Sequence, residues 1–239
     1  HVKTSHLNNY YNFILKNHKK INGDIVEAGV FKGRSLLATA LMMKANKINK
    51  KIFAFDTWSG FPKKYKTDIQ DKLNNWPKLY RNKLITKKHY DSINKNLHTI
   101  SYLKGIKKKN INSYNLSTSG DFSQVKLSDI KRKAKLLKLN NIIFIKGSFE
   151  NTMKKSVKNL DKIMCALVDV DLYRSYKVTL DFLWPKMTNK GMIYLDEYYS
   201  LKFPGARIAC NEFCNIHSVK PKLLSRDEDG FERYAIFKL

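Results

Sequence analysis

Residues 23–45, GDIVEAGVFKGRSLLATALMMKA, join a short apolar strand to an apolar helix through a turn that contains two glycines. Residues 24–28 have the length of a buried strand, and residues 35–45 carry apolar side chains along most of a helix. Gly29 and Gly33 bracket the turn. A glycine there lets a ligand approach the backbone and the free N–H groups at the start of the helix. The segment predicts an α/β fold with a ligand site at the end of this strand.

The rest of the chain repeats the alternation of strand and helix. A second strand ends at Asp56, and the remaining segments follow in order: helix 123–139, strand 141–147, helix 149–158, strand 162–169, helix 172–184, strand 191–197, helix 205–217, and strands at 220–226 and 232–239. This order predicts a doubly wound, mostly parallel sheet of seven strands with helices on both faces, closed by an antiparallel pair.

Two segments lie outside this alternation. Residues 1–20 space their apolar side chains as an amphipathic helix does, and we expect that helix to pack on the main fold. Residues 63–121 are rich in Lys, Asn and Tyr, and we expect short helices near 68–82 and 89–103. Because an insertion of this length is usually a lid or a binding segment, we interpret 1–239 as one domain that carries a basic lid.

The net charge of +26 is concentrated in one region. Residues 59–140 contain 20 Lys and Arg but only 5 Asp and Glu. An acidic partner near that segment is one interpretation, for example a phosphorylated sugar, an anionic membrane surface or a nucleic acid. The other is a solvated surface whose lysines reflect genome composition. The chain has 39 Lys against 7 Arg, which argues against a dedicated nucleic-acid reader.

Cysteine usage and hydropathy indicate the compartment. No run of eighteen apolar residues is present, and three cysteines in a chain of this length argue against a disulfide framework. We therefore expect a reducing, cytoplasmic location. Cys210, Cys214 and His217 are spaced along one face of a predicted helix, and packing on that face is favoured over a zinc site because a fourth ligand is not evident.

Four acidic residues follow two apolar strands. Asp169 and Asp171 come after one strand, and Asp196 and Glu197 after the next. If these strands are neighbours, the carboxylates converge and a hard divalent cation offsets their repulsion. Spacing alone does not decide which aspartate is a ligand and which is a base. The alternatives are a helix cap for Asp171 and a solvated strand end for Asp196 and Glu197.

Acidic and small residues also follow the other strands. Glu27 places a carboxylate in the glycine turn, which favours a cationic ligand over a diphosphate. Asp56 is suited to hold the two hydroxyls of a ribose. Gly147 and Ser148 are expected to line an adenine slot. The candidate cofactor contacts are Glu27, Gly29, Ser35, Asp56, Thr57, Gly147, Ser148 and Phe149.

Four stretches carry a family resemblance: GDIVEAGVFKGRSLL, FAFDTWSGFP, IKGSFENTM and VDVDLYRSYKVTLDFLWPKMTNKGMIYLDEY. From about residue 20 to 215 the chain resembles the macrocin O-methyltransferase family, which includes mycinamicin and novobiocin sugar O-methyltransferases. The resemblance implies a class I fold that uses S-adenosylmethionine and Mg2+ to methylate a sugar hydroxyl of a glycan, glycolipid or glycosylated natural product. It also implies a possible homodimer.

The resemblance assigns roles by position. Asp169, Asp196 and Glu197 match the Mg2+ ligands, and Asp171 matches the general base. Glu27 and Gly29 match the motif at the methionine end of the cofactor, and Asp56 matches the ribose-binding acid. The family usually has Asp-Asp where this chain has Asp196-Glu197, and its lid is shorter, so acceptor identity does not carry over. A catechol-type O-methyltransferase and a nucleic-acid-binding protein or RNA methyltransferase are the alternatives.

Overall fold

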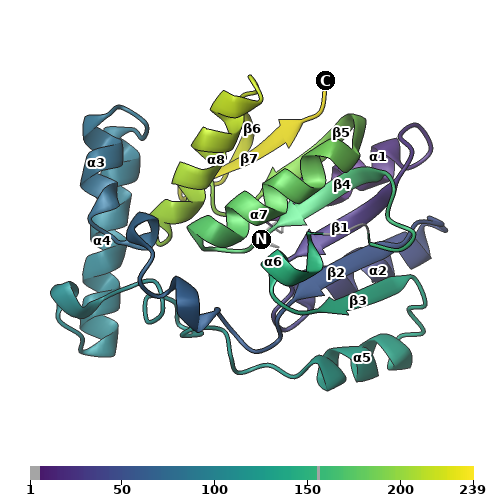
Figure 1. Ribbon diagram of the computed structural model, residues 1–239, viewed down its shortest axis with the longest axis horizontal. Helices are drawn as coiled ribbons and strands as arrows, with labels where there is room; N and C mark the ends of the chain where they lie inside the picture. Colours follow the sequence, from purple (N-terminus) through teal and green to yellow (C-terminus); the bar gives the residue numbers. More distant parts are fainter. Residues whose placement is uncertain (1–5, 155–156) are drawn as a thin grey trace.

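The structure is a computed structural model that describes residues 6–154 and 157–239. Its centre is a seven-stranded sheet in the order β3-β2-β1-β4-β5-β7-β6 (Figure 1). The first five strands of that order are parallel, and β7 is antiparallel to both β5 and β6. The predicted α/β fold class is confirmed. The strands are β1 (Asp24–Ala28), β2 (Ile52–Asp56), β3 (Ile142–Lys146), β4 (Ile163–Val168), β5 (Met187–Leu195), β6 (Lys222–Arg226) and β7 (Glu232–Phe237).

Helices cover both faces of the sheet. On one face α1 (Asn8–Asn17), α2 (Arg34–Ala45) and α5 (Leu127–Leu136) bury residues such as Tyr10, Leu36 and Ile130 against it. On the other face, α6 (Phe149–Thr152), α7 (Tyr173–Leu183) and α8 (Pro204–Ile216) pack around a second cluster that includes Tyr176 and Phe213. Successive residues of a strand point to opposite faces, so each parallel strand contributes to both clusters.

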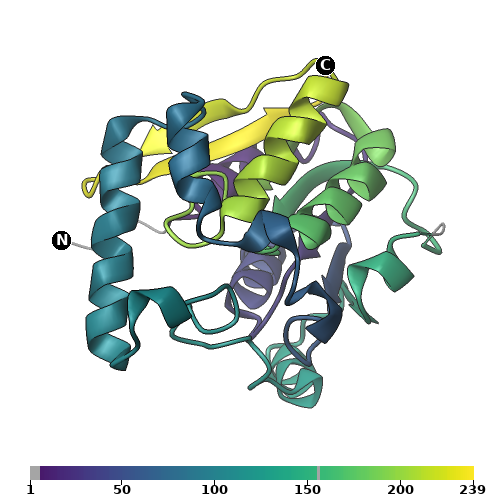
Figure 2. The ribbon, with the colours of Figure 1, turned by 60° about the vertical axis from the view of Figure 1, so that its left-hand side comes forward.

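The insertion at 63–121 contains α3 (Asn75–Arg81), α4 (Lys87–Lys104) and three short 3-10 segments, η1 (Lys63–Tyr65), η2 (Ile69–Asp71) and η3 (Lys108–Asn110). Figures 1 and 2 both show α3 and α4 side by side, outside the sheet and beyond α8. Small cores of its own support the segment, one around Trp76 and Ile93 and one around Ile100 and Leu116. It is therefore a packed substructure and not an irregular loop.

Several element boundaries differ from the sequence expectation. The helix expected over 68–82 is divided into η2 and α3, and the helix expected over 123–139 is the shorter α5. Before α5, the carboxylate of Asp121 accepts hydrogen bonds from the N–H and the hydroxyl of Ser123, which makes a turn there instead of a helix start. The helix expected over 149–158 is the shorter α6, which ends at Thr152, and residues 155–156 lie outside the described residues.

In the part of the chain that the structure describes, no helix is both long enough and apolar enough to cross a membrane.

Candidate active site

The candidate site lies where the parallel strands β1, β2, β4 and β5 end. The N–H of Asp169 donates to the carbonyl of Ala28 (2.9 Å), and the N–H of Asp196 donates to the carbonyl of Val168 (3.0 Å). These bonds continue the ladders β1–β4 and β4–β5 by one residue. The expectation that the two acidic strand ends are neighbours is therefore confirmed.

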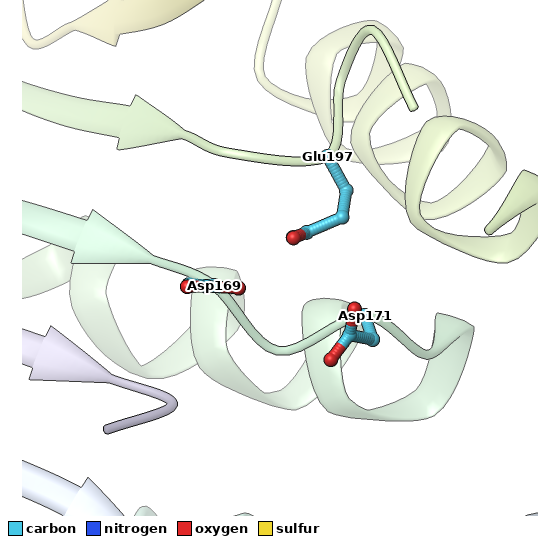
Figure 3. A group of neighbouring side chains, drawn as sticks. All are labelled: Asp169, Asp171 and Glu197. Carbon is cyan, nitrogen blue, oxygen red and sulfur yellow. The ribbon is translucent and has the colours of Figure 1, made fainter. Parts of the chain in front are cut away.

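Three carboxylates converge at this edge of the sheet. Oxygen atoms of Asp169, Asp171 and Glu197 all lie within 4.8 Å of one another. Figure 3 shows Glu197 reaching from the loop after β5 toward the turn between β4 and α7, which carries both aspartates. Within the described residues, no other group of three His, Cys, Asp or Glu side chains is close enough to hold a metal ion. Cys210, Cys214 and His217 do not form such a group.

Asp196 and Asp171 differ in their surroundings: Asp196 faces an arginine, whereas Asp171 is buried in a left-handed turn. The Oδ1 atom of Asp196 is buried, lies 4.0 Å from Nη1 of Arg233 and has no hydrogen-bond partner among the described residues. Asp171 is buried, and its backbone adopts a left-handed conformation with φ of 59°. The capping position of α7 is occupied by Leu172, so Asp171 is not the helix cap that the sequence offered as an alternative.

The environment makes it costly for these carboxyl groups to be ionised together. Desolvation and the charge of Asp196 raise the pKa of Asp169 to about 7. Burial, followed by the charge of Asp169, raises the pKa values of Asp171 and Glu197 well above their usual range. A divalent cation among the three would remove this penalty, because it attracts the ionised forms. Clustered oxygen donors of this kind are the ligands that Mg2+ prefers.

The position of Glu197 depends on a tyrosine of α7. The hydroxyl of Tyr176 lies 2.7 Å from Oε2 of Glu197 and accepts a hydrogen bond from the N–H of Glu197 (3.1 Å). Tyr176 is fully buried beneath the site. We did not predict this role, because a tyrosine at helical spacing in an apolar segment looks like an ordinary core residue.

Asp56 organises the glycine turn. Its Oδ2 accepts hydrogen bonds from the N–H groups of Val30 (2.7 Å) and Phe31 (2.8 Å), and its Oδ1 accepts one from Trp58 (2.6 Å). Asp56 therefore binds N–H groups of the glycine turn and of the loop after β2, whereas the N–H groups at the start of α2, which the sequence predicts to be free for a ligand, are not among its partners. The predicted contact between Asp56 and a ribose stays a prediction.

Glu27 is a fully buried carboxyl group beneath the start of α2. The hydroxyl of Ser35 donates to its Oε1 at 2.6 Å, whereas Oε2 has no hydrogen-bond partner among the described residues. Burial raises the pKa of Glu27 to about 8, although the Ser35 hydrogen bond acts in the opposite direction. A buried acceptor without a donor is costly, and an ammonium group of a ligand would satisfy it.

Three cavities that share lining residues run along this edge of the sheet. The central one, of about 110 Å³, lies between the glycine turn and the acidic cluster; it is lined by Gly29, Asp56, Thr57, Phe149, Asp169 and Asp171, and by Phe31, Phe61 and Phe122. A cavity of about 470 Å³ on one side includes Ser35 and Asp169. A cavity of about 630 Å³ on the other side includes Thr57, Gly147 and Ser148. Seven of the eight predicted cofactor residues therefore line these three neighbouring cavities, whereas Glu27 is not among the lining residues.

Comparison with known proteins gives a family and a fold. The family model of macrocin-O-methyltransferase matches residues 3–118 and 109–232. The structure of the O-methyltransferase NovP is 17% identical, with a TM-score of 0.62 over 95% of this chain and 76% of that chain. CalS11, a calicheamicin methyltransferase, is 18% identical, with a TM-score of 0.63 over 97% and 76%. No curated protein matches the sequence.

A third similar structure is a complex with S-adenosylhomocysteine. It is the methyltransferase PaMTH1 of Podospora anserina, which is 12% identical, with a TM-score of 0.50 over 99% of this chain and 80% of that chain. At these identities the three structures show the fold, and the family model shows the family. The chain therefore belongs to the macrocin-O-methyltransferase family of S-adenosylmethionine-dependent O-methyltransferases.

Proposed function

We propose that this protein is a Mg2+-dependent O-methyltransferase that methylates a sugar hydroxyl of a glycan, glycolipid or glycosylated natural product. The observation that carries this proposal is the group formed by Asp169, Asp171 and Glu197, whose carboxylate oxygens lie within 4.8 Å of one another. A buried cluster of acids with raised pKa values is costly for the fold alone and well suited to a divalent cation.

The residues divide the chemistry between them. Asp169 and Glu197 would hold the cation. Asp196, which is beside Asp169 on the neighbouring strand, would supply a third ligand through its Oδ1, which lies 4.0 Å from Arg233 and has no hydrogen-bond partner among the described residues. Mg2+ bound there would orient two neighbouring hydroxyl oxygens and lower the pKa of the one to be methylated. Asp171 accepts the proton of that hydroxyl, because its carboxylate is buried beside the cation site and lines the central cavity.

The three cavities are the proposed cofactor site. Glu27 and Ser35 hold the amino group of the methionine end, because Glu27 is a buried carboxyl group with one unpartnered oxygen. Asp56 and Thr57 lie in the middle, at the ribose, and Gly147, Ser148 and Phe149 surround the adenine. The aromatic walls formed by Phe31, Phe61 and Phe122 exclude water from the central cavity.

The acceptor is proposed to be an anionic glycoside. One structure of CalS11 names that protein a TDP-rhamnose 3'-O-methyltransferase, so a sugar attached to a diphosphate is an acceptor within this fold. In the present chain the charge of residues 59–140 is strongly positive. Such a surface attracts anionic ligands in a manner that salt screens. Methylation of an anionic glycoside should therefore slow with rising ionic strength, and that of a neutral glycoside should not.

Calorimetric titration of S-adenosylhomocysteine, with and without Mg2+, tests the cofactor site. We expect micromolar binding by the native chain and loss of binding in Asp56→Ala. An absence of binding under every condition would refute an active cofactor site.

A panel of acceptors with S-adenosylmethionine and Mg2+ then tests the chemistry. We expect turnover of glycosides that stops when EDTA is added. Turnover of catechols alone, or transfer to sugars that is unaffected by EDTA, would refute the proposed acceptor class or the role of the cation.

A further inference from the structure

Asp71 lies in the insertion but contacts the helix that follows the acidic turn. It ends η2, is only 5% exposed, and accepts a hydrogen bond at its Oδ1 from the N–H of Tyr173 (2.9 Å). Tyr173 is the first residue of α7, which lies 102 positions further along the chain. A carboxylate at this place satisfies a free N–H group and interacts favourably with the helix dipole.

In the described part of the chain, neither of the two helices that meet at Asp71 is capped by the side chain of its own N-cap residue. Leu172 precedes α7 and Phe203 precedes α8, and neither makes a capping hydrogen bond. Gly205, in the first turn of α8, lies so close that a Cβ atom there would stand 2.0 Å from Oδ1 of Asp71. One buried carboxylate therefore occupies the place where the starts of α7 and α8 converge.

The same contact fixes the downstream end of the acidic turn. Asp171 precedes Tyr173 by two residues and has a left-handed backbone, a conformation that non-glycine residues adopt at a cost. Upstream, the N–H of Asp169 is bound to the carbonyl of Ala28. Asp71 supplies the corresponding attachment downstream. The turn that carries two of the three clustered carboxylates is thus held at both ends.

The insertion is attached to the other site loops as well. The hydroxyl of Ser113 donates to the carbonyl of Asp71 (2.8 Å), which holds the 3-10 turn from within the insertion. The ring of His89 hydrogen-bonds to the carbonyl of Ser200 (2.8 Å), three residues after Glu197. The N–H of Phe61, after β2, donates to the carbonyl of Asp121 at the far end of the insertion (2.9 Å).

We propose that Asp71 is a positioning residue of the active site, through which the insertion fixes the turn that carries Asp169 and Asp171. It does so by capping α7 in place of a local residue. The insertion thereby braces the acidic turn and does not move as a free lid at this point. The proposal is tested by Mn2+ binding and by hydrogen exchange, and only the first of these measurements rests on the proposed cation site.

The test compares Asp71→Ala, Asp71→Asn and Asp68→Ala by titration with Mn2+, followed by the electron paramagnetic resonance signal of the free ion. Asp68 is a matched control, because it caps the same 3-10 segment by accepting from the N–H of Gln70 and, within the described residues, makes no hydrogen bond to α7. We expect Asp71→Ala to weaken Mn2+ binding about tenfold, in the range typical of residues that orient metal ligands. Asp71→Asn, which keeps an acceptor oxygen, and Asp68→Ala should remain within about threefold of the native chain, with S-adenosylhomocysteine binding unchanged in these two variants.

Hydrogen exchange in the absence of metal gives the second readout. We expect the amides of residues 170–176 to exchange faster in Asp71→Ala than in the native chain and Asp68→Ala, with no change in β1 or β2. If Asp71→Ala does not fold, Gly205→Ala displaces the same carboxylate and takes its place in both measurements. Native Mn2+ affinity together with native exchange would overturn the proposal. A native chain that fails to bind Mn2+ would refute the cation site, and exchange alone would then decide on Asp71.

Discussion

The carbonyl oxygen of Asp169 lies directly against the Cα atom of Gly29. A Cβ atom on Gly29 would stand 1.7 Å from that oxygen, and the glycine has a φ of 85°. Its N–H also donates to the carbonyl of Phe55 at 3.0 Å. Glycine is therefore required at position 29 because the glycine turn and the acidic turn are in contact there, whether or not a ligand is bound. This contact fixes the distance between the two halves of the site.

Replacing Gly29 with alanine should destabilise the protein and abolish cofactor binding. The left-handed backbone and the clash with Asp169 together cost about 2–5 kcal/mol. Gly105→Ala is the matched control, because Gly105 has a φ of 61° but no atom of the described residues lies within 4 Å of the place that a Cβ atom would take there. It should lose only the cost of the left-handed backbone, about 1–2 kcal/mol. Thermal unfolding measures both, and equal losses in the two variants would show that the contact with Asp169 is not significant.

Asp56→Ala should lower stability even without ligand. The substitution leaves the N–H groups of Val30, Phe31 and Trp58 without their acceptor, which costs about 1–3 kcal/mol. Asp24→Ala is the control, because Asp24 accepts one N–H, that of Lys51, at the opposite end of the strands. Chemical denaturation of the ligand-free chains makes the comparison. If Asp56→Ala lost cofactor binding but kept the free energy of unfolding of the native chain, Asp56 would contribute only by binding the ribose.

The sequence was sufficient for the sheet because the apolar runs are short, bounded by turn residues and separated by helices. It was less reliable within the insertion. The expected helix over 68–82 fails because polar side chains compete with the helical pattern. Asp68 caps the 3-10 segment, and the side-chain amide of Asn75 donates to the carbonyls of Ile69 and Gln70. Local hydrogen bonds of this kind are not visible in hydrophobic periodicity.

For the site, the residues at strand ends were predictable and the residues behind them were not. Strand order places Asp169 beside Asp196 without knowledge of side chains. By contrast, the contacts of Tyr176 with Glu197 and of Asp71 with Tyr173 join segments 21 and 102 residues apart. No spacing rule connects such pairs, because they depend on how helices and the insertion pack.

The pair Asp171→Asn and Asp196→Asn separates a cation ligand from a neighbouring base. We expect Asp196→Asn to weaken Mn2+ binding by more than the roughly 10–100-fold typical of an outer partner, and Asp171→Asn to remain within that range while methyl transfer stops. Asp181→Asn, on the exposed face of α7, is the control. If Asp171→Asn weakened Mn2+ binding more than Asp196→Asn did, Asp171 would be the ligand. The cation would then be held by Asp169, Asp171 and Glu197, whose carboxylate oxygens lie within 4.8 Å of one another.

His89 should make stability fall as the solution becomes acidic. Its ring is buried, stacks on Tyr199 at 3.8 Å and donates to the carbonyl of Ser200, and burial lowers its pKa from 6.5 to about 4. The folded state keeps the ring neutral while the unfolded chain takes up a proton below pH 6.5. The neutral ring therefore contributes fully to the free energy of unfolding above pH 6.5. This contribution, up to about 3 kcal/mol, is lost as the pH falls toward 4.

Urea denaturation at pH 6.5 and pH 4 measures this effect in the native chain and in His89→Phe. The stability of the native chain relative to the variant should fall at the lower pH, because phenylalanine keeps the stacked ring and cannot be protonated. His98→Phe, at an exposed position of the same helix, should follow the native chain. A His89→Phe variant with native pH dependence would show that acid destabilisation arises elsewhere.

Binding of S-adenosylhomocysteine should release a proton from Glu27. In the free protein its pKa is about 8, so the group is mostly protonated at pH 7. An ammonium group placed against the unpartnered Oε2 favours the ionised form and lowers that pKa. Calorimetry in buffers of different ionisation enthalpy should therefore report release of nearly one proton at pH 7 and about half a proton at pH 8, with affinity rising over this range. Glu27→Gln should bind more weakly and release none. If the native chain and Glu27→Gln release the same number of protons, the amino group of the cofactor does not meet Glu27.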